Sequence, residues 1–534
     1  ERAVLDSAHV GDIQGAFGTI RQHEVAGRSW RARGLALLAI IGPGLIVMVG
    51  DNDAGGVATY SQAGQNYGTS LLWVLLLLIP VLIVNQEMVV RLGAVTGVGH
   101  ARLINERFGR FWGWFSVGDL FLLNFLTIVT EFIGVSLALG YFGVSAYVSV
   151  PIAAVLLVAI TVTGSFRAWE RSMFVFVFAN LLIIPLFFLS KPDIGQMAHN
   201  FFVPGIAGGA NSTSVLLIIA IVGTTVAPWQ LFFQQSNIID KRITPTWINY
   251  ERLDTWIGAF VVVIGAAALL GVSAFAFHGT PYQGQFTDAG GTASALKATL
   301  GPVAGAFFAV VLLNASLIGA GALTLSTSYA FGDMFGTKSS LHRSFSDAKG
   351  FYAMFAALIA GAAAIVLIPG APLGVITTAV QALAGVLLPS ATVFLLMLCN
   401  DRAVLGPWCN TPWLNALASV IVGVLVLLSL ILMATTVFPN IDVTSFALIG
   451  GGVLAVGLGG YGLWSLRARR GARAVTVIET GPTVPKAQWT MPPLTFLEPA
   501  VWSTGRKAAM LALRGYLVVS VVLLVVKAVQ LGGG

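Results

Sequence analysis

Two aspartates interrupt the first long apolar stretch of the chain. Residues 35–50 and the apolar sequence from Val57 onward read as two halves of one membrane-crossing segment, and between them stands Asp51-Asn52-Asp53-Ala54-Gly55-Gly56. A carboxylate inside a membrane is costly and by default marks a functional site. Two of them beside the free carbonyl groups of an interrupted helix predict a cation-binding site. The alternative is a plain turn, because Asn, Asp and Gly are all turn formers.

The sixth apolar segment is interrupted in a similar way. It runs to Val226 and then meets Ala227-Pro228-Trp229-Gln230. Proline removes a backbone donor and clashes with the preceding turn, so the helix must open there. Taken alone, this would indicate an ordinary kink. Breaks in the first and sixth segments, five spans apart, are typical of two inverted repeats that hold a substrate between them near the bilayer midplane. We therefore expect residues 51–56 to face residues 224–230.

The composition is that of a multi-pass membrane protein. Of the 534 residues, 57% are hydrophobic and 10% are charged, whereas globular domains carry about a quarter charged residues. The fold class predicted is all-α and polytopic. The net charge of +7 comes from loops on one side of the predicted topology, with only Lys191 and Lys297 on the other. This is the positive-inside pattern, so we expect a cell-membrane protein with a cytoplasmic N-terminus, a lipid bilayer around it and no nucleic-acid partner.

A membrane span needs about 20 apolar residues. This rule predicts spans near 35–65 (broken), 70–90, 112–142, 147–163, 172–190, 213–239 (broken), 255–278, 302–334, 351–368, 373–399, 413–436 and 444–466. Residues 508–530 form either a further span or an interfacial helix. The predicted regions are a cytoplasmic tail (1–34), a first repeat of helices 1–5 (35–190), a second repeat of helices 6–10 (213–400), two additional helices (413–466) and a cytoplasmic segment with the possible further helix (467–534).

Both breaks resemble signatures of the Nramp transporters of divalent metals, a family with the leucine-transporter fold. Gly42-Pro43-Gly44 and residues 53–59 look like the family's first-helix signature, and residues 226–231 stand where its sixth-helix signature falls. Gln381, eight residues before Pro389, resembles the tenth-helix glutamine that faces the metal; residues 86–97 and Asp401-Arg402 also match. The resemblance covers at least the first ten spans. It implies two inverted five-helix repeats, broken helices 1 and 6, and additional C-terminal helices.

The departures from the family pattern concern the ion. Ala227 stands where the family has a methionine sulfur, Gly56 replaces an asparagine ligand, and Asp51 stands where the family often has tyrosine. Soft sulfur ligands select transition metals, while oxygen and water suit Mg²⁺ and Mn²⁺. Mg²⁺ dehydrates reluctantly and is usually held by one or two carboxylates. We therefore expect a wide, anionic pocket for a largely hydrated ion, most readily Mg²⁺ and also Mn²⁺.

The breaks and the resemblance together define the candidate residues. The metal site is assigned to Asp53, Asp51, Gly50, Gly56, Thr224, Ala227 and Gln381. Supporting or pathway residues are Asn52, Glu131, Trp229, Gln230 and Gln234. Gln381 could instead form an interhelical hydrogen bond, and Glu131 could pair with a neighbouring helix.

The residues that correspond to the family's proton machinery are altered. Its two sixth-helix histidines correspond to Trp229 and Gln234, and its third-helix acidic pair to Glu131 and Gly134. Proton relays need chains of titratable groups, so we expect passive transport, as in the branch called Nramp-related magnesium transporters. The alternatives are a proton-coupled Mn²⁺ or Fe²⁺ transporter, a membrane metal sensor that does not transport, and a sodium-coupled carrier of an organic solute. We expect no enzymatic activity, no cofactor beyond the transported ion and no required oligomer.

Overall fold

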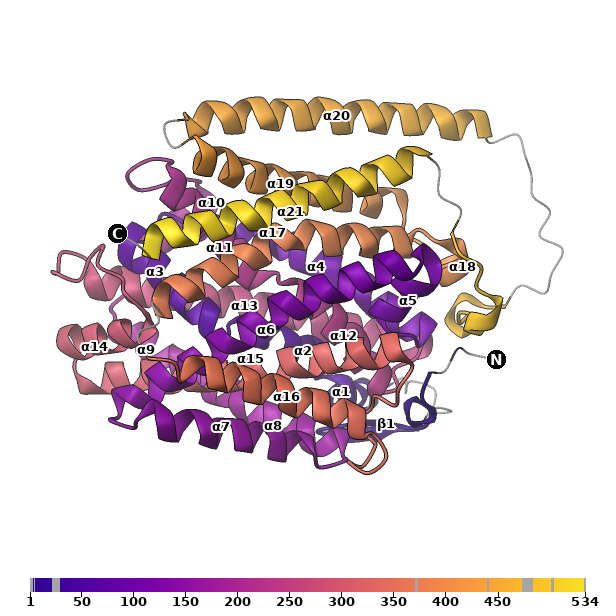
Figure 1. The fold of residues 1–534 in the computed structure, drawn as a ribbon, viewed down its shortest axis with the longest axis horizontal. Helices are drawn as coiled ribbons and strands as arrows, with labels where there is room; N and C mark the ends of the chain where they lie inside the picture. Colours follow the sequence, from indigo (N-terminus) through magenta and orange to yellow (C-terminus); the bar gives the residue numbers. More distant parts are fainter. Residues whose placement is uncertain are drawn as a thin grey trace.

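In the computed structural model, long helices run side by side and their connections gather at the two ends of the bundle (Figure 1). The structure describes residues 3, 5–21, 29–369, 373–438, 441–472, 484–500 and 504–532. The elements are η1 (Ser7–His9), β1 (Ile13–Gly15), β2 (Gly18–Ile20), α1 (Trp30–Ile40), α2 (Pro43–Asp51), α3 (Ala54–Tyr67), α4 (Leu72–Thr96), α5 (His100–Phe108), α6 (Arg110–Tyr141), α7 (Ala146–Thr161), α8 (Phe166–Ala179), η2 (Asn180–Leu182), α9 (Ile183–Leu189), α10 (Ile194–Phe202), α11 (Ser212–Thr225), α12 (Pro228–Asp240), η3 (Pro245–Trp247), α13 (Ile248–Phe277), α14 (Ala289–Leu300), α15 (Pro302–Phe335), α16 (Lys349–Val366), α17 (Leu373–Cys399), α18 (Arg402–Leu405), η4 (Gly406–Trp408), α19 (Pro412–Val437), α20 (Val443–Ala472), η5 (Lys486–Gln488), η6 (Leu494–Phe496) and α21 (Thr504–Gly532).

The helices of the bundle have the length of membrane spans. By length and composition, ten helices among the described residues can cross a membrane, and the bent pair α1 and α2 brings the number to eleven. At the predicted span 147–163 the apolar helix α7 is shorter than the others. The all-α polytopic class is confirmed for the bundle, whereas the division into repeats and the other predicted region boundaries stay predictions.

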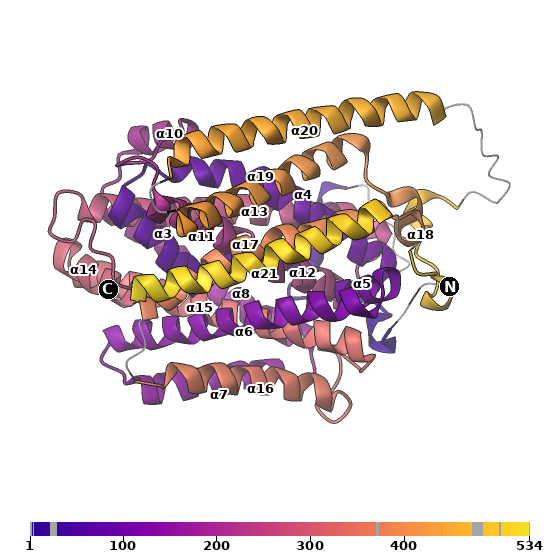
Figure 2. The same ribbon diagram turned by 45° about the horizontal axis from the view of Figure 1, so that its top comes forward.

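The two ends of the bundle carry different elements. The strands, α5 and α18 lie at one end, and α10 and α14 lie at the other (Figures 1 and 2). We call the first the N-terminal end. An ion pair there joins α5 to the start of α18, with Arg107 Nη2 2.6 Å from Asp401 Oδ2. These two segments, which the sequence assigns to one side of the membrane, therefore lie together, while the side that they face stays a prediction.

The first segment is broken twice. α2 ends at Asp51 and α3 begins at Ala54, which confirms the predicted interruption. Residues 35–50 do not form one helix, however, because α1 ends at Ile40 and the chain bends by 53° before α2. Gly42 makes this bend with a φ of 153°, which favours glycine, and Pro43 at the first helical position starts α2. The expectation of a continuous half-helix was therefore wrong.

The sixth segment is broken as predicted. α11 ends at Thr225 and α12 begins at Pro228. Asn211 and Ser214 form a capping box that fixes the start of α11. The most apolar stretch of α11 and α12 is completely buried. This segment therefore occupies the centre of the bundle, where a broken backbone can be satisfied by protein groups.

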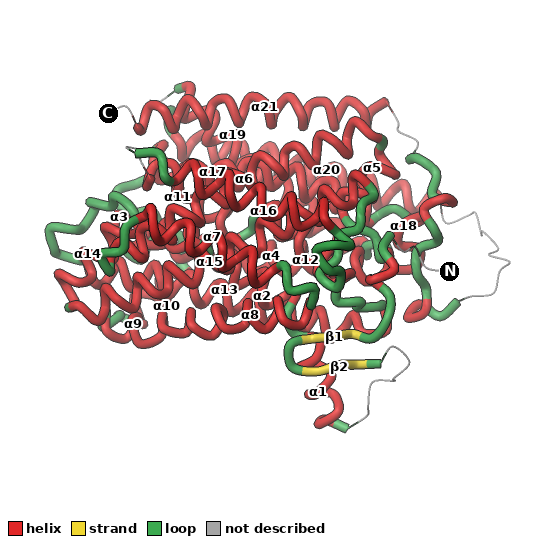
Figure 3. The backbone as a smooth tube through the Cα atoms, turned by 60° about the horizontal axis from the view of Figure 1, so that its bottom comes forward, coloured by secondary structure: helices red, strands yellow, loops and turns green. Residues whose placement is uncertain are grey.

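The N-terminal region is folded. β1 and β2 form an antiparallel hairpin that pairs Ile13 with Ile20 and Gly15 with Gly18, and it lies beside α1 (Figure 3). Both isoleucines are buried. The sequence analysis gave residues 1–34 as a cytoplasmic tail and did not foresee this hairpin, which leaves the all-α class of the bundle unchanged. Three-residue strands are too short for a clear alternating pattern, which explains why the sequence did not reveal them.

The last helix belongs to the bundle. α21 packs against α17 and α19 and runs along them. The Arg514 guanidinium lies 4.6 Å and 5.5 Å from the ring centroids of Phe111 and Phe115 on α6. Residues 508–530 therefore lie parallel to the spans, as a further span would, and not across their ends.

Two glycines set the contact between α11 and α17. A methyl group on Gly223 would collide with the Gln381 carbonyl oxygen and the Gly385 amide nitrogen. One on Gly385 would lie 2.5 Å from the Ile219 carbonyl oxygen. Small residues allow membrane helices to approach backbone to backbone. This glycine seam therefore fixes the position of α17 against the broken sixth segment.

We expect Gly223→Ala to lower the melting temperature, because the added methyl group has no space between the two backbones and overpacking costs about 1–3 kcal/mol. Gly118→Ala on α6 is the matched control, since no atom of another element lies within 4 Å of its added carbon. Thermal unfolding of the detergent-solubilised protein measures the difference. Equal or higher stability of Gly223→Ala would contradict the close contact.

Candidate metal-binding site at the two helix breaks

The two breaks face each other, as the sequence predicts. The Tyr60 hydroxyl on α3 lies 2.7 Å from Thr225 Oγ1 at the end of α11. A methyl group on Gly56 would lie 3.1 Å from Thr224 Oγ1, and one on Gly50 would lie 3.3 Å from the Trp229 ring. Residues predicted from two distant stretches of sequence are thus brought together in the middle of the bundle.

Two carboxylates occupy the start of α3. Asp53 is its N-cap, and Oδ1 accepts a hydrogen bond of 2.7 Å from the Gly56 amide. Glu131 on α6 accepts one of 3.0 Å from the Ala54 amide. The N-terminus of a helix carries partial positive charge and free N–H groups, so it stabilises both carboxylates. Glu131 lies beside the predicted site, and its contact supports a structural role.

Asp51 has the opposite surroundings. It is the last residue of α2, where the helix dipole is negative. The residue is fully buried, and neither carboxylate oxygen has a hydrogen-bond partner among the described residues. The Gln230 amide lies near the Asp51 carboxylate but does not form a hydrogen bond with it. This amide instead donates to the Thr225 carbonyl oxygen and accepts a hydrogen bond from the Gln86 amide. A bound cation would compensate this carboxylate and the carbonyl end of α2 at once.

Other buried polar atoms converge on the same place. Thr224 Oγ1, Glu131 Oε1 and Gln381 Nε2 have no hydrogen-bond partner among the described residues. Gln381 reaches α3, since a methyl group on Gly55 would overlap its amide. A half-turn of this amide about its last side-chain bond would present its oxygen in place of Nε2. The donors on offer are therefore oxygens, which suit hard cations.

The number of charged ligands is small. Within the described residues, no three His, Cys, Asp or Glu side chains are grouped to hold a metal ion. Ala227, at the N-cap of α12, is buried and brings no side-chain donor. The side chains that could hold an ion here are therefore two aspartates and neutral polar groups.

One expectation about the site needs correction. Gly56 was expected to widen the pocket by replacing a larger ligand. In the structure its Cα faces the Asp51 carbonyl oxygen, which would lie 2.8 Å from an added methyl group. Gly56 therefore permits a close approach of backbone across the break, and the space of the missing side chain is filled.

The remaining predicted residues support the breaks from outside. The Asn52 amide donates to the Val262 carbonyl oxygen on α13 at 3.1 Å, and the Gln234 amide donates to Thr255 Oγ1 on α13 at 2.8 Å. The Trp229 carbonyl oxygen accepts from the Ser326 hydroxyl on α15 at 3.1 Å. We read these contacts as anchors for the breaks and not as ligands.

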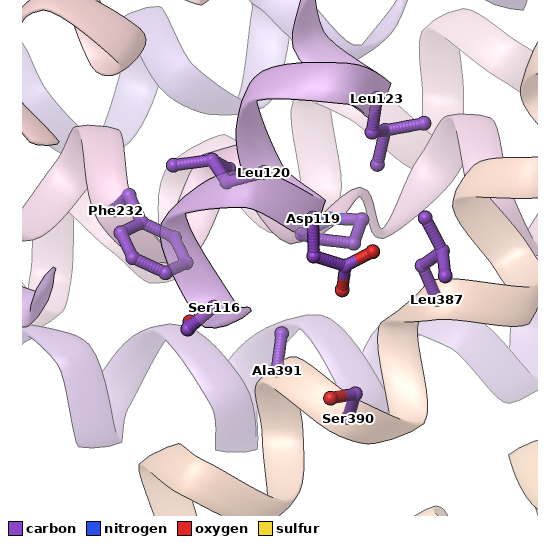
Figure 4. Close-up of a pocket in the computed structure, with 9 residues that line it drawn as sticks. Ser116, Asp119, Leu120, Leu123, Phe232, Leu387, Ser390 and Ala391 are labelled. Atoms are coloured by element: carbon purple, nitrogen blue, oxygen red, sulfur yellow. The ribbon is translucent and has the colours of Figure 1, made fainter. Parts of the chain in front are cut away.

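A narrow pocket adjoins the start of α12. It is lined by Ser116, Asp119, Leu120, Leu123, Pro228, Phe232, Leu387, Ser390 and Ala391 from α6, α12 and α17. The Asp119 carboxylate points into it (Figure 4). The sequence shows Asp119 as an aspartate within a span, but nothing in the pattern links it to Pro228. Its position next to the second break emerges from the fold.

The break itself is closed to solvent. Asp51, Asp53 and Gln381 are 0%, 2% and 1% exposed. The site is therefore enclosed between the two ends of the bundle, and an ion reaches or leaves it only after a movement of the helices.

Comparison with known proteins identifies the family. The profile described as Nramp, natural resistance-associated macrophage protein-like, matches residues 44–435, which include both breaks and Gln381. The chain belongs to the Nramp family. It is therefore a membrane transporter of this family and not an enzyme, as the sequence predicts.

Relatives of this Nramp protein carry names that concern metals. The divalent metal cation transporter MntH of Mesorhizobium japonicum is 27% identical over 419 residues, which cover 75% of this chain and 90% of the relative. MntH of Ralstonia nicotianae is 29% identical over 400 residues, covering 72% and 87%. A crystal structure of the Eremococcus coleocola manganese transporter has a TM-score of 0.64 at 21% identity, covering 84% of this chain and 98% of that one. It has the same fold as this chain.

The two roles of Asp53 can be separated by substitution. We expect Asp53→Asn to retain the melting temperature, because asparagine caps a helix as well as aspartate does. Asp53→Ala should lower stability by about 1 kcal/mol, since the Gly56 amide loses its acceptor. Both variants lose the charge offered to an ion. Thermal unfolding without added metal tests the cap, and equal melting temperatures for the two variants would contradict it.

Proposed function

We propose that this Nramp protein transports divalent metal ions, Mg²⁺ and also Mn²⁺, by alternating access around the breaks of α2–α3 and α11–α12. The observation that carries the proposal is the Asp51 carboxylate, buried at the negative end of α2 with no hydrogen-bond partner among the described residues. A divalent cation is the group that such a position stabilises. The names of the relatives support the substrate class.

The choice of a hard, partly hydrated ion rests on the donors. Asp51, Asp53 and Thr224 offer oxygen, Gln381 would offer its amide oxygen after a half-turn of the amide, and Ala227 offers no sulfur. Mg²⁺ and Mn²⁺ favour such oxygen ligands. Softer ions are selected by a thioether, and the methionine that would supply it is replaced here by Ala227. The burial of the break supports an occluded form, in which a bound ion has no access to solvent at either end of the bundle.

The proposal includes transport without proton coupling. Gln234 and Trp229 carry side chains that do not titrate near neutral pH. Gln234 is hydrogen-bonded to Thr255, and the Trp229 ring lies against Gly50. Glu131 is engaged by the Ala54 amide. A second candidate is a proton-coupled Mn²⁺ or Fe²⁺ transporter. The structural neighbour named as a manganese transporter and the retained Glu131 favour it, and the measurement below separates the two.

Uptake into proteoliposomes with a dye for internal pH tests the proposal. We expect Mg²⁺ and Mn²⁺ to enter without acidification. Asp53→Asn should reduce the initial rate at least about tenfold, which corresponds to about 1.4 kcal/mol, and Asp51→Asn should reduce it less. Internal acidification driven by Mg²⁺ would contradict uncoupled transport. Mn²⁺ uptake without Mg²⁺ uptake would favour the second candidate.

The role of Ala227 is tested by adding the missing sulfur. We expect Ala227→Met to shift selectivity from Mg²⁺ toward Cd²⁺ about tenfold, because a thioether attracts soft ions. Ala220→Met, which adds the same side chain to a buried position of α11 away from the break, is the matched control. Competition of Cd²⁺ with Mg²⁺ uptake measures the shift. An equal effect of both variants would contradict a position of Ala227 beside the ion.

A further inference from the structure

The N-terminal hairpin is attached to the bundle through one face of α8. The Arg167 guanidinium donates to the Gly15 carbonyl oxygen and that of Arg171 to the Ala16 carbonyl oxygen, each at 2.9 Å. Between them, Glu170 accepts a hydrogen bond of 2.5 Å from the Ala16 amide. Residues three and four apart share one face of a helix. This face of α8 is therefore dedicated to the backbone of the hairpin turn.

The hairpin also packs against α1 in direct backbone contact. A methyl group on Gly15 would collide with the Ala39 carbonyl oxygen, and one on Gly18 would lie 3.0 Å from the Ala39 Cβ. The side chains of Ile13 and Ile20 in the hairpin are buried. The two glycines thus let the strands lie directly on the last turn of α1.

The residues before the hairpin reach a different part of the chain. Asp6 Oδ1 lies 2.5 Å from Arg343 Nη2, in the loop between α15 and α16. Partial burial raises the pKa of Asp6, but hydrogen bonds from Arg343 and the Ala8 amide lower it by more, so the net shift is downward and the ion pair is favoured. Arg242, just after α12, donates to the Ala8 carbonyl oxygen at 2.9 Å. Residues 5–20 therefore connect α8, in the first predicted repeat, with two loops of the second; we call them the N-terminal clamp.

Beneath the clamp lies a buried ion pair that holds the first bend. Lys241 Nζ lies 2.6 Å from Glu170 Oε1, and both side chains are fully buried. The same ammonium group donates to the carbonyl oxygens of Ile40 and Ile41, at 2.6 Å and 3.0 Å. Glu170 thus joins the Ala16 amide of the clamp to the end of α1 through one lysine.

The other side of the bend is held by Asp254 on α13. Its carboxylate accepts hydrogen bonds from the amides of Gly42, Gly44 and Leu45, at 3.0 Å, 2.7 Å and 3.2 Å. These amides are the free donors at the start of α2. α2 then runs without interruption to Asp51. A continuous set of contacts therefore extends from the N-terminal clamp to the proposed ion-binding break.

We propose that the N-terminal clamp slows transport by holding the start of α2 against α8 and α13 at the N-terminal end of the bundle. Glu170, Lys241 and Asp254 act as positioning residues for the α1–α2 bend. Release of the clamp frees the start of α2 to move away from α8 and α13. This inference rests on the proposed transport function for its effect on rate. Its effect on structure is independent of any ion.

Detachment of the clamp is tested with the full-length chain carrying Arg167→Ala and Arg171→Ala together. Hydrogen–deuterium exchange of the purified protein is followed in peptides covering residues 13–20 and 41–51, and Mg²⁺ and Mn²⁺ uptake is measured in proteoliposomes. We expect exchange to quicken at least threefold in both peptides, and the initial uptake rate to rise at least twofold. Arg33→Ala, which removes an exposed arginine of α1, is the matched control and should change neither.

A second variant, Gly15→Val, separates the clamp from the loss of arginine charge. It pushes the hairpin off Ala39 and should reproduce both effects. Faster exchange in residues 13–20 with unchanged exchange in residues 41–51 would overturn the link to α2. Faster exchange in both peptides with an equal or lower uptake rate would overturn the restraint. Absence of uptake in the parent protein would count against the proposed function, while the exchange results still decide whether the clamp holds α2.

Discussion

A helix that ends inside a membrane protein leaves charge and hydrogen-bonding groups that no water can satisfy, and the first segment must meet this constraint twice. At the break between α2 and α3, the positive end of α3 is matched by Asp53 and Glu131. The negative end of α2 is given a further negative charge, Asp51. The N-terminus of α3 is thus capped by carboxylates, whereas the C-terminal end of α2 carries an additional negative charge with no compensating group among the described residues. The sixth segment packs around this negatively charged end.

The bend at Gly42 shows the same constraint solved with protein groups alone. Lys241 compensates the carbonyl end of α1, and Asp254 compensates the amide end of α2. A lysine ammonium group therefore supplies the positive charge at the α1–α2 bend. At the α2–α3 break, the proposed function assigns the same role to a divalent cation. The comparison separates a junction that protein groups satisfy completely from one whose proposed role is to hold an exchangeable ion.

Much of this arrangement follows from the sequence, because breaks in membrane helices have strong local signals. Pro228 and the run from Asp51 to Gly56 identified both interruptions, and the expected approach of residues 51–56 to residues 224–230 is seen between Gly56 and Thr224. Long-range pairs had no such signal. Glu170 and Lys241 are 71 positions apart, and one sequence does not show which of many charged residues will meet. The effect of Gly56 was also misjudged, since the sequence does not reveal that backbone fills the space of a missing side chain.

The glycine seam between α11 and α17 has a consequence for how the ion's surroundings are built. Thr224 and Gln381 belong to these two helices, whose backbones touch at Gly223 and Gly385. Because close-packed backbones do not slide past each other at small cost, these two donors keep their mutual spacing as a rigid template. Asp51 and Asp53 stand at the α2–α3 break, in the segment that also bends at Gly42. In the proposed function, the coordination shell of the ion would be completed only when this bent segment docks onto the rigid pair of helices.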